Sequence, residues 1–180
     1  MTVTETKLPG VYIIEPRVFS DSRGWFMETF SKKKTPKIDC GEFIQDNHSF
    51  SAQKGTLRGI HFQYQPMEQA KLVRCVSGAI MDFAVDLRPD SETYKKWICV
   101  ELSAENKKQL FIPRGFGHAF VTLTENAEIV YKTDNYYSPE HDGTVLWSDP
   151  ELGITWGVDN PILSDKDKNA LPLKDVINSL

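Results

Sequence analysis

The stretch Ala79-Ile80-Met81-Asp82-Phe83-Ala84-Val85-Asp86-Leu87 alternates between two kinds of side chain. Successive side chains of a β-strand point to opposite faces of a sheet, so this stretch predicts a strand with one apolar and one mixed face. We expect the apolar face, with Met81, Phe83, Val85 and Leu87, to lie in a core. On the mixed face, we interpret Asp86, near Arg88, as solvated, whereas Asp82 fits either a solvated position or an interior one with a partner or function.

Short runs of β-prone residues extend on both sides of this stretch. They are separated by turn signals such as Gln53-Lys54-Gly55, Ser77-Gly78 and Pro113-Arg114-Gly115. Many short strands at such spacing predict an antiparallel sandwich or barrel. The expected strands are Val11–Ile14, Trp25–Phe30, Phe43–Phe50, Thr56–Gln63, Lys71–Val76, Ala79–Leu87, Trp97–Leu102, Gln109–Ile112, Gly117–Leu123 and Glu128–Thr133, and Val145–Trp147 could form one more.

The remaining segments predict loops or short helices. The polar segment 31–41 could hold a short helix or a loop, and Pro36 limits any helix there. Ser164-Asp165-Lys166-Asp167 resembles a capped helix start with an acidic first turn, and Leu171 to Leu180 could carry one or two helical turns. We therefore expect an all-β, mainly antiparallel fold with a few short helices, mostly near the C-terminus.

Length and composition indicate one globular domain over residues 1–180. A chain of 180 residues that is 40% hydrophobic can bury one sizeable core rather than two. The formal net charge is -4, and no Lys/Arg cluster alternates with aromatic residues, so we expect no nucleic-acid partner. The run Lys32-Lys33-Lys34 is interpreted as surface charge.

Cysteine usage and hydropathy predict a soluble cytoplasmic protein without a membrane partner. The three cysteines are odd in number and widely spaced, which gives neither a disulfide framework nor a metal-binding pair. Cys75 and Cys99 lie in apolar runs and are expected to be buried, as in a reducing compartment. The N-terminus has no apolar signal region, and no apolar stretch approaches the length of a membrane span.

Two motifs bear on a metal site. Residues 113–118, Pro-Arg-Gly-Phe-Gly-His, fit the Pro-x-Gly-x-x-His pattern of the second cupin motif. The first cupin motif has His-x-His followed by Glu, and this chain has His61-Phe62-Gln63 with Glu68 downstream. Two imidazoles, an amide and one carboxylate make a poor transition-metal site. The pattern therefore predicts a cupin-like double-stranded β-helix, or jelly-roll barrel, without a metal.

The same segments contain the groups that proton transfer without a metal requires. His61 can act as a base, although a histidine beside Arg58 and Gly59 is as readily structural as catalytic. Lys71 can face a developing oxyanion, and Tyr131 can be the acid. Tyr131 could also be an ordinary strand tyrosine, and His118 could be a core histidine.

Nine specific blocks follow one another along most of the chain, from about Gly10 to Pro172. They are Phe19–Glu28, Gln45–Ser49, Leu57–Gln63, Lys71–Arg74, Glu101–Ser103, Ile112–His118, Tyr131–Thr133, Tyr136–Pro139 and Leu163–Asp167. Each alone is a weak motif, but nine in order are specific. Together they resemble the dTDP-4-dehydrorhamnose 3,5-epimerases, a family of cofactor-free cupins.

The resemblance implies an isomerase that converts dTDP-4-dehydro-6-deoxy-D-glucose to dTDP-4-dehydro-L-rhamnose. It implies that His61 is the proton acceptor, that Asp167 orients it, that Tyr131 is the proton donor and that Lys71 stabilises the enolate. A ketone at C4 acidifies the C–H bonds at C3 and C5, so one base and one opposed acid can invert both carbons without a redox cofactor.

The resemblance also implies a site for the dTDP-sugar. Arginine suits bidentate phosphate contacts, and histidine can donate to sugar or phosphate oxygens. Tyr137 resembles the tyrosine that stacks on thymine, with the adjacent Tyr136 as the alternative. The family typically has Glu at the position of Asp142, so this shorter carboxylate needs a water bridge or a small loop shift. The implied binding residues are Arg23, Glu28, Gln45, Asn47, Arg58, Lys71, His118, Tyr137, Asp142 and Lys166.

One local conflict yields a structural prediction. Strict strand alternation puts Arg58 and His61 on opposite faces, although the resemblance implies one site for both. We therefore predict a bulge or a strong twist at or near Gly59.

Several alternatives remain open at this point. They include an epimerase of one centre or of another nucleotide 4-keto sugar, a ketoisomerase of the same fold, a non-catalytic sugar-binding cupin and a metal-dependent cupin oxygenase. The resemblance also implies a homodimer that exchanges an N-terminal strand, and Val11 to Ile14 would suit this role.

Overall fold

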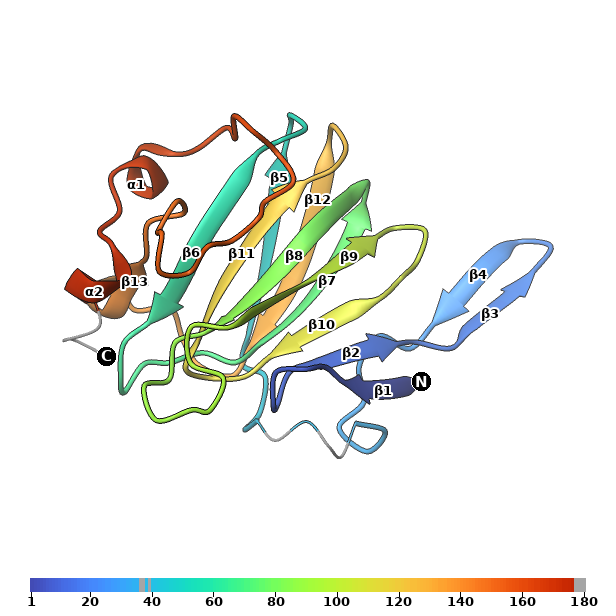
Figure 1. Ribbon diagram of the computed structural model, residues 1–180. Coiled ribbons are helices and arrows are strands. Elements are labelled where there is room, and N and C mark those ends of the chain that lie inside the picture. Colours follow the sequence, from blue (N-terminus) through green and yellow to red (C-terminus); the bar gives the residue numbers. More distant parts are fainter. Residues whose placement is uncertain (36–37, 39, 177–180) are drawn as a thin grey trace.

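Two antiparallel sheets face each other in the computed structural model, which describes residues 1–35, 38 and 40–176 (Figure 1). The six-stranded sheet contains, in spatial order, β1 (Thr2–Glu5), β2 (Tyr12–Glu15), β10 (Gln109–Ile112), β7 (Lys71–Ser77), β12 (Ala127–Thr133) and β5 (Gln45–Ser51). The five-stranded sheet contains β13 (Asp142–Thr144), β6 (Leu57–Gln63), β11 (Phe116–Thr122), β8 (Ala79–Asp86) and β9 (Trp97–Ser103). The predicted mainly antiparallel jelly-roll barrel is confirmed.

The remaining elements lie outside the two sheets. Strands β3 (Val18–Asp21) and β4 (Gly24–Met27) form a separate hairpin that stands away from the barrel (Figure 1). Among the residues that the structure describes, the helices are a 3-10 turn η1 (Pro139–His141) and two short α-helices, α1 (Asp165–Lys168) and α2 (Leu173–Val176). In the described part of the chain, no helix has the length and apolar character that crossing a membrane requires.

Local sequence patterns locate most of the strands. The eight strands predicted between Phe43 and Thr133 are confirmed within two residues at each end. The helix predicted at Ser164 is confirmed, with Ser164 as the cap of α1. The extra strand was predicted in the wrong place, since β13 precedes Val145–Trp147. Of the predicted C-terminal turns, α2 forms one; Ile177 to Leu180, like Pro36, lie outside the described residues.

The space between the sheets is filled by the main core. Val73 on β7 and Ile129 on β12 meet Ile80 on β8 and Phe120 on β11, and all four are at least 95% buried. Burying such side chains stabilises a fold by about 1.5–3 kcal/mol each. This core therefore joins the two sheets into one barrel.

A second core covers the outer face of the five-stranded sheet. The apolar face of β8, with Met81, Phe83 and Val85, packs there as predicted. Its partners come from the C-terminal segment and include Trp156, whose ring lies 4.7 Å from that of Phe83. This packing holds the segment that carries α1 against the barrel.

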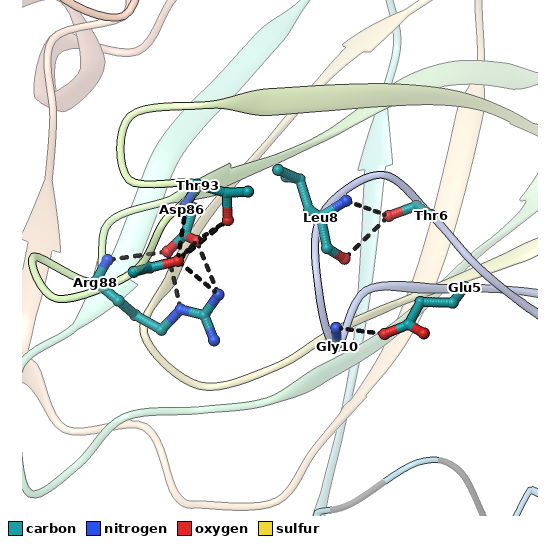
Figure 2. Close-up of polar contacts among 8 residues, drawn as sticks. Glu5, Thr6, Leu8, Gly10, Asp86, Arg88 and Thr93 are labelled. Atoms are coloured by element: carbon teal, nitrogen blue, oxygen red, sulfur yellow. Dashed lines mark hydrogen bonds and ion pairs between the residues drawn. The ribbon is translucent and has the colours of Figure 1, made fainter.

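The interpretation of Asp86 as part of a solvated face is wrong. Asp86 is fully buried, and it accepts hydrogen bonds from Arg88 Nε at 2.9 Å and from the hydroxyls of Ser91 and Thr93, each at 2.6 Å. Figure 2 shows Arg88 and Thr93 converging on this carboxylate. Burial raises the pKa of Asp86, but these hydrogen bonds outweigh it and leave the pKa lowered. The turn after β8 thus supplies the partners that a buried carboxylate needs.

The expectation for the cysteines is half confirmed. Cys75 on β7 is 4% exposed, whereas Cys99 on β9 is exposed and the prediction of its burial is wrong. Cys99 pairs with Phe83, so its side chain lies on the outer face of the sheet, away from the core between the sheets, and on this edge strand it is exposed.

Candidate active site

His61 on β6 and Asp167 on α1 form a close pair. His61 Nε2 lies 2.6 Å from Asp167 Oδ1, although the residues are 106 positions apart. The chain just before α1 pairs with the start of β6 and the turn before it, because the Leu57 backbone donates to Ile162 and the Ile162 backbone donates to Gly55. Asp167 thereby reaches His61 from the first turn of α1.

The partners of Asp167 determine which nitrogen of the His61 ring carries a proton. Burial raises the pKa of Asp167, but hydrogen bonds from His61 and Ser164 outweigh it, so the net pKa is lowered and the group is ionised. Ser164 Oγ donates to Asp167 Oδ2 at 2.8 Å. An ionised carboxylate only accepts, so His61 Nε2 carries a proton toward Asp167, and His61 Nδ1 is left as a potential base.

A cavity of about 160 Å³ lies between His61 and the facing sheet. Lys71 on β7 and Tyr131 on β12 line its other side, and the Lys71 ammonium lies 6.0 Å from the centre of the Tyr131 ring. A base and a hydroxyl therefore stand on opposing sheets. The complete lining is His61, Phe62, Gln63, Gln69, Lys71, Tyr131, Tyr137, Asp142 and Lys166.

Burial shifts the acidity of both groups on the six-stranded sheet. Desolvation lowers the pKa of Lys71 to about 8, against a smaller opposing effect of Asp82 and Asp142. Desolvation raises the pKa of Tyr131, while the charge of Arg58 acts the other way. Tyr131 is therefore protonated near neutral pH, and Lys71 is mostly charged there.

The predicted irregularity at Gly59 is present in β6. His61 pairs with His118 on β11, yet Arg58 pairs with Phe120, so three steps on β6 match two on β11. Gly59 has φ +127°, a conformation that other residues rarely adopt. The bulge reverses the alternation, as predicted.

Arg58 reaches the facing sheet despite its exposure. Its Nε donates to Ser51 Oγ at 3.2 Å and its terminal nitrogen to the Phe50 carbonyl at 3.0 Å, both on β5. Its charge also acts on Tyr131. Arg58 thus lies at the rim of the same inter-sheet space as His61.

Five residues expected to bind the nucleotide gather at the mouth of the cavity. The Tyr137 hydroxyl donates to Asp142 Oδ2 at 3.3 Å, and Lys166 Nζ donates to the same oxygen. On β5, Gln45 Oε1 accepts from the Tyr137 backbone at 3.1 Å, and Gln45 Nε2 donates to Asn47 Oδ1 at 3.1 Å. Tyr137 rather than Tyr136 lines the cavity.

His118 lies deeper than a simple binding residue would. It is 7% exposed, does not line the cavity, and its Nε2 lies 2.7 Å from Asp82 Oδ1. Burial lowers the pKa of His118 in spite of the opposing carboxylate. Asp82 is fully buried, so it occupies the interior position and not the solvated one. Its second oxygen has no hydrogen-bond partner among the described residues.

Two predicted binding residues lie elsewhere in this chain. Arg23 is at the tip of the β3–β4 hairpin, where it pairs with Asp21 at 2.6 Å and its side chain is 87% exposed. Glu28 follows the hairpin and pairs with Lys34 at 2.9 Å. Neither lines the cavity around His61.

Gln63, Gln69 and Ser164 belong to the site without having been predicted as site residues. The clue for Ser164 was its helix-cap position, three residues before Asp167. Gln69 donates to the Asn135 carbonyl at 2.9 Å, and no local pattern in the sequence signals this contact. Within the described ranges, no three His, Cys, Asp or Glu side chains come together as metal ligands.

Known proteins are similar to this chain in sequence and in fold. A family model described as dTDP-4-dehydrorhamnose 3,5-epimerase matches residues 5–175. The enzyme of that name from Shigella flexneri is 52% identical over 177 residues, which cover 97% of each chain. The crystal structure of dTDP-4-dehydrorhamnose 3,5-epimerase from Elizabethkingia anophelis NUHP1 is 48% identical, with a TM-score of 0.92 over 97% of each chain. An epimerase from Legionella pneumophila Philadelphia 1, in complex with dTDP-4-keto-L-rhamnose, is 41% identical, with a TM-score of 0.90 over 96% of this chain and 93% of that one.

Proposed function

The chain belongs to the dTDP-4-dehydrorhamnose 3,5-epimerase family, and on this premise we propose how its cavity converts dTDP-4-dehydro-6-deoxy-D-glucose to dTDP-4-dehydro-L-rhamnose. One observation carries the proposal. The His61–Asp167 pair belongs to one side of the cavity, and Lys71 and Tyr131 belong to the sheet opposite. Inversion of a carbon needs this arrangement, because the proton must leave from one face and return from the other.

The first step is proton abstraction next to the ketone. His61 Nδ1 takes the proton from C3 or C5, and the electron pair of the C–H bond moves into an enolate with its charge on the C4 oxygen. The Lys71 ammonium donates a hydrogen bond to that oxygen. Asp167 stabilises the imidazolium that forms and keeps its ring oriented.

The second step returns a proton from the opposite face. Tyr131 donates its hydroxyl proton to the carbanionic carbon, and the charge of nearby Arg58 favours the resulting phenolate. Solvent then restores the proton of Tyr131 and removes that of His61. Repetition at the other carbon completes the reaction, and no atom changes its oxidation state, so the reaction needs no redox cofactor.

Product analysis tests this function. Purified protein is incubated with dTDP-4-dehydro-6-deoxy-D-glucose, the 4-ketone is reduced chemically, and the released sugars are identified by chromatography. We expect rhamnose among the products, because both centres are inverted. A sugar inverted at C3 or C5 alone would instead identify a single-centre epimerase, and unchanged substrate would contradict catalysis.

The acidity of Lys71 predicts the alkaline limb of the pH profile. The folded-state pKa of about 8 means that the ammonium loses its charge as pH rises through this value, and enolate stabilisation is lost with it. We expect kcat/KM, which reports the free enzyme, to fall above about pH 8. In Lys71→Arg the guanidinium stays charged, so the limb should move to higher pH even if the rate is lower. An unmoved limb would contradict this role.

We infer that the enzyme is a homodimer. The β3–β4 hairpin exposes Phe19, Trp25 and Phe26 by at least 50%, and within the described residues its strands pair only with each other. An exposed apolar surface of this kind indicates a protein interface. A hairpin inserted into a second copy would bring Arg23 and Glu28 to the cavity of that copy, where they would contact the nucleotide.

Mixing two inactive variants tests the exchange. Arg23→Ala inactivates the cavity of the partner subunit, and His61→Asn inactivates the cavity of its own chain. One of the two cavities in a mixed dimer is then intact, so co-refolded variants should recover about a quarter of wild-type activity. The matched mixture of His61→Asn with Asp167→Asn should recover none, because these residues serve one cavity. Failure of the first mixture would place Arg23 outside the shared site.

We also propose that residues 1–180 form one catalytic domain that works in the cytoplasm. The family model spans nearly the whole chain. In the described part of the chain Cys75 and Cys99 form no disulfide, as is usual for proteins of a reducing compartment.

A further inference from the structure

Gln63 ends β6 and is 7% exposed. Its amide nitrogen donates to the Met67 carbonyl and, at 3.1 Å, to the Tyr136 carbonyl. Its amide oxygen accepts from the Ser138 backbone nitrogen at 2.7 Å. One buried side chain therefore joins the end of a strand to two separate loops.

The chemistry of the amide fixes its orientation. Two carbonyl oxygens face one end and a backbone N–H faces the other, so only one of the two amide orientations satisfies all three partners. Both N–H donors of Gln63 are consumed by backbone groups. The side chain that stands where a metal-binding cupin has its second histidine is thus committed to holding the backbone.

The held loop carries Tyr137. Gln63 on β6 fixes the backbone on both sides of this residue, and Gln45 on β5 accepts from the Tyr137 nitrogen itself at 3.1 Å. Strands β5 and β6 belong to opposite sheets, so the loop is anchored across the mouth of the barrel.

The ring of Tyr137 has little other support. The residue is 54% exposed, and among the described residues its side chain makes one hydrogen bond, to Asp142 at 3.3 Å. An exposed ring that is not packed keeps its direction mainly through its backbone. The position of Tyr137 therefore depends on the three backbone hydrogen bonds of Gln63, to Met67, Tyr136 and Ser138, which together we call the clamp.

We propose that Gln63 is a positioning residue that pre-organises Tyr137 to stack on the thymine of the bound nucleotide. The inference rests on the proposed function and on the family resemblance, which implies that Tyr137 stacks on thymine. It predicts that Gln63 governs nucleotide affinity and not the proton transfers, because the clamp touches the binding loop and none of the proton-transfer groups. Restraining a loop in its bound conformation improves affinity by removing the ordering cost of binding.

The first test separates affinity from rate. In Gln63→Leu we expect the Kd of dTDP, measured by calorimetry, and the KM of the sugar nucleotide to rise about tenfold. The kcat at saturation should stay within about threefold of wild type, because the proton-transfer residues are untouched. A fall in kcat with unchanged Kd and KM would overturn the proposal.

Two further variants guard against a general loss of stability. Gln63→Glu keeps the acceptor for Ser138 but sets a carboxylate against two carbonyls. It should therefore raise the Kd of dTDP, as Gln63→Leu does. Thr122→Val is the matched control, because Thr122 is 1% exposed and its hydroxyl also makes two backbone hydrogen bonds, to Thr56 and Gln53. It should lower the melting temperature without changing the Kd of dTDP. A comparable rise in Kd in the control would overturn the proposal.

A double-mutant cycle shows whether Gln63 acts through Tyr137. Tyr137→Ala alone should raise the Kd of dTDP about tenfold, because the stacking contact is lost. Adding Gln63→Leu to Tyr137→Ala should then change the Kd by less than about twofold. Effects that multiply would show that Gln63 acts independently, which overturns the proposal. If Tyr137→Ala leaves the Kd unchanged, the proposal also fails, whereas the product analysis still decides the epimerase function.

Discussion

Replacing His61 with Asn lowers kcat by about 10²–10⁴-fold, the usual contribution of a positioned general base. His61 lines the cavity with one nitrogen committed to Asp167 and the other left for the substrate. Asparagine has no group that accepts a proton at neutral pH, whereas the groups that bind the nucleotide remain. Steady-state kinetics should therefore show a large loss in kcat with little change in KM.

Two companion variants delimit this effect. Asp167→Asn should also lower kcat strongly, because an amide no longer fixes the ring tautomer or stabilises the imidazolium. His48→Asn is the histidine control, since His48 lies on β5 with an exposed side chain paired to Glu128 at 2.8 Å. It should keep nearly full activity. A His61→Asn enzyme within about tenfold of wild-type kcat would contradict the assignment of the base.

Replacing Gly59 with Ala destabilises the fold by about 3 kcal/mol or more. A Cβ at this position would lie 2.5 Å from Ala119 Cβ and 2.6 Å from the His118 carbonyl oxygen, both on the neighbouring strand. The φ of +127° adds strain for any residue with a side chain. Relief would require β6 and β11 to separate, which would also displace Arg58 and His61.

Urea denaturation measures this change, with Gly41→Ala as the control. Gly41 has open space around its Cβ position, so alanine there should change the free energy of unfolding by less than about 0.5 kcal/mol. If Gly59→Ala loses under about 1 kcal/mol, the close approach at the bulge does not control the stability of β6.

Local sequence patterns predicted the strands well, and partners distant in sequence poorly. The alternation of apolar and polar residues located β8 and its apolar face, because side chains on the buried face of a strand are mostly apolar. The conflict between Arg58 and His61 even revealed the bulge. The polar β1 was not predicted, since it is a strand only through its pairing with β2.

The site was predictable in chemistry more than in geometry. No local pattern could join His61 to Asp167 across 106 positions; family resemblance supplied that pairing. The burial of Asp86 was missed because its partners come from the turn that follows β8. Likewise, Arg23 fits a nucleotide site by its chemistry, but its hairpin leaves the barrel of its own chain.

The central claim is that one base, His61, serves both C3 and C5, and hydrogen exchange with heavy water tests this claim most directly. The 4-keto sugar nucleotide is incubated with enzyme in D2O and followed by NMR. We expect deuterium at both C3 and C5 with the wild-type enzyme, and at neither carbon with His61→Asn. Label at one carbon alone, or label at either carbon that persists in His61→Asn, would contradict the mechanism.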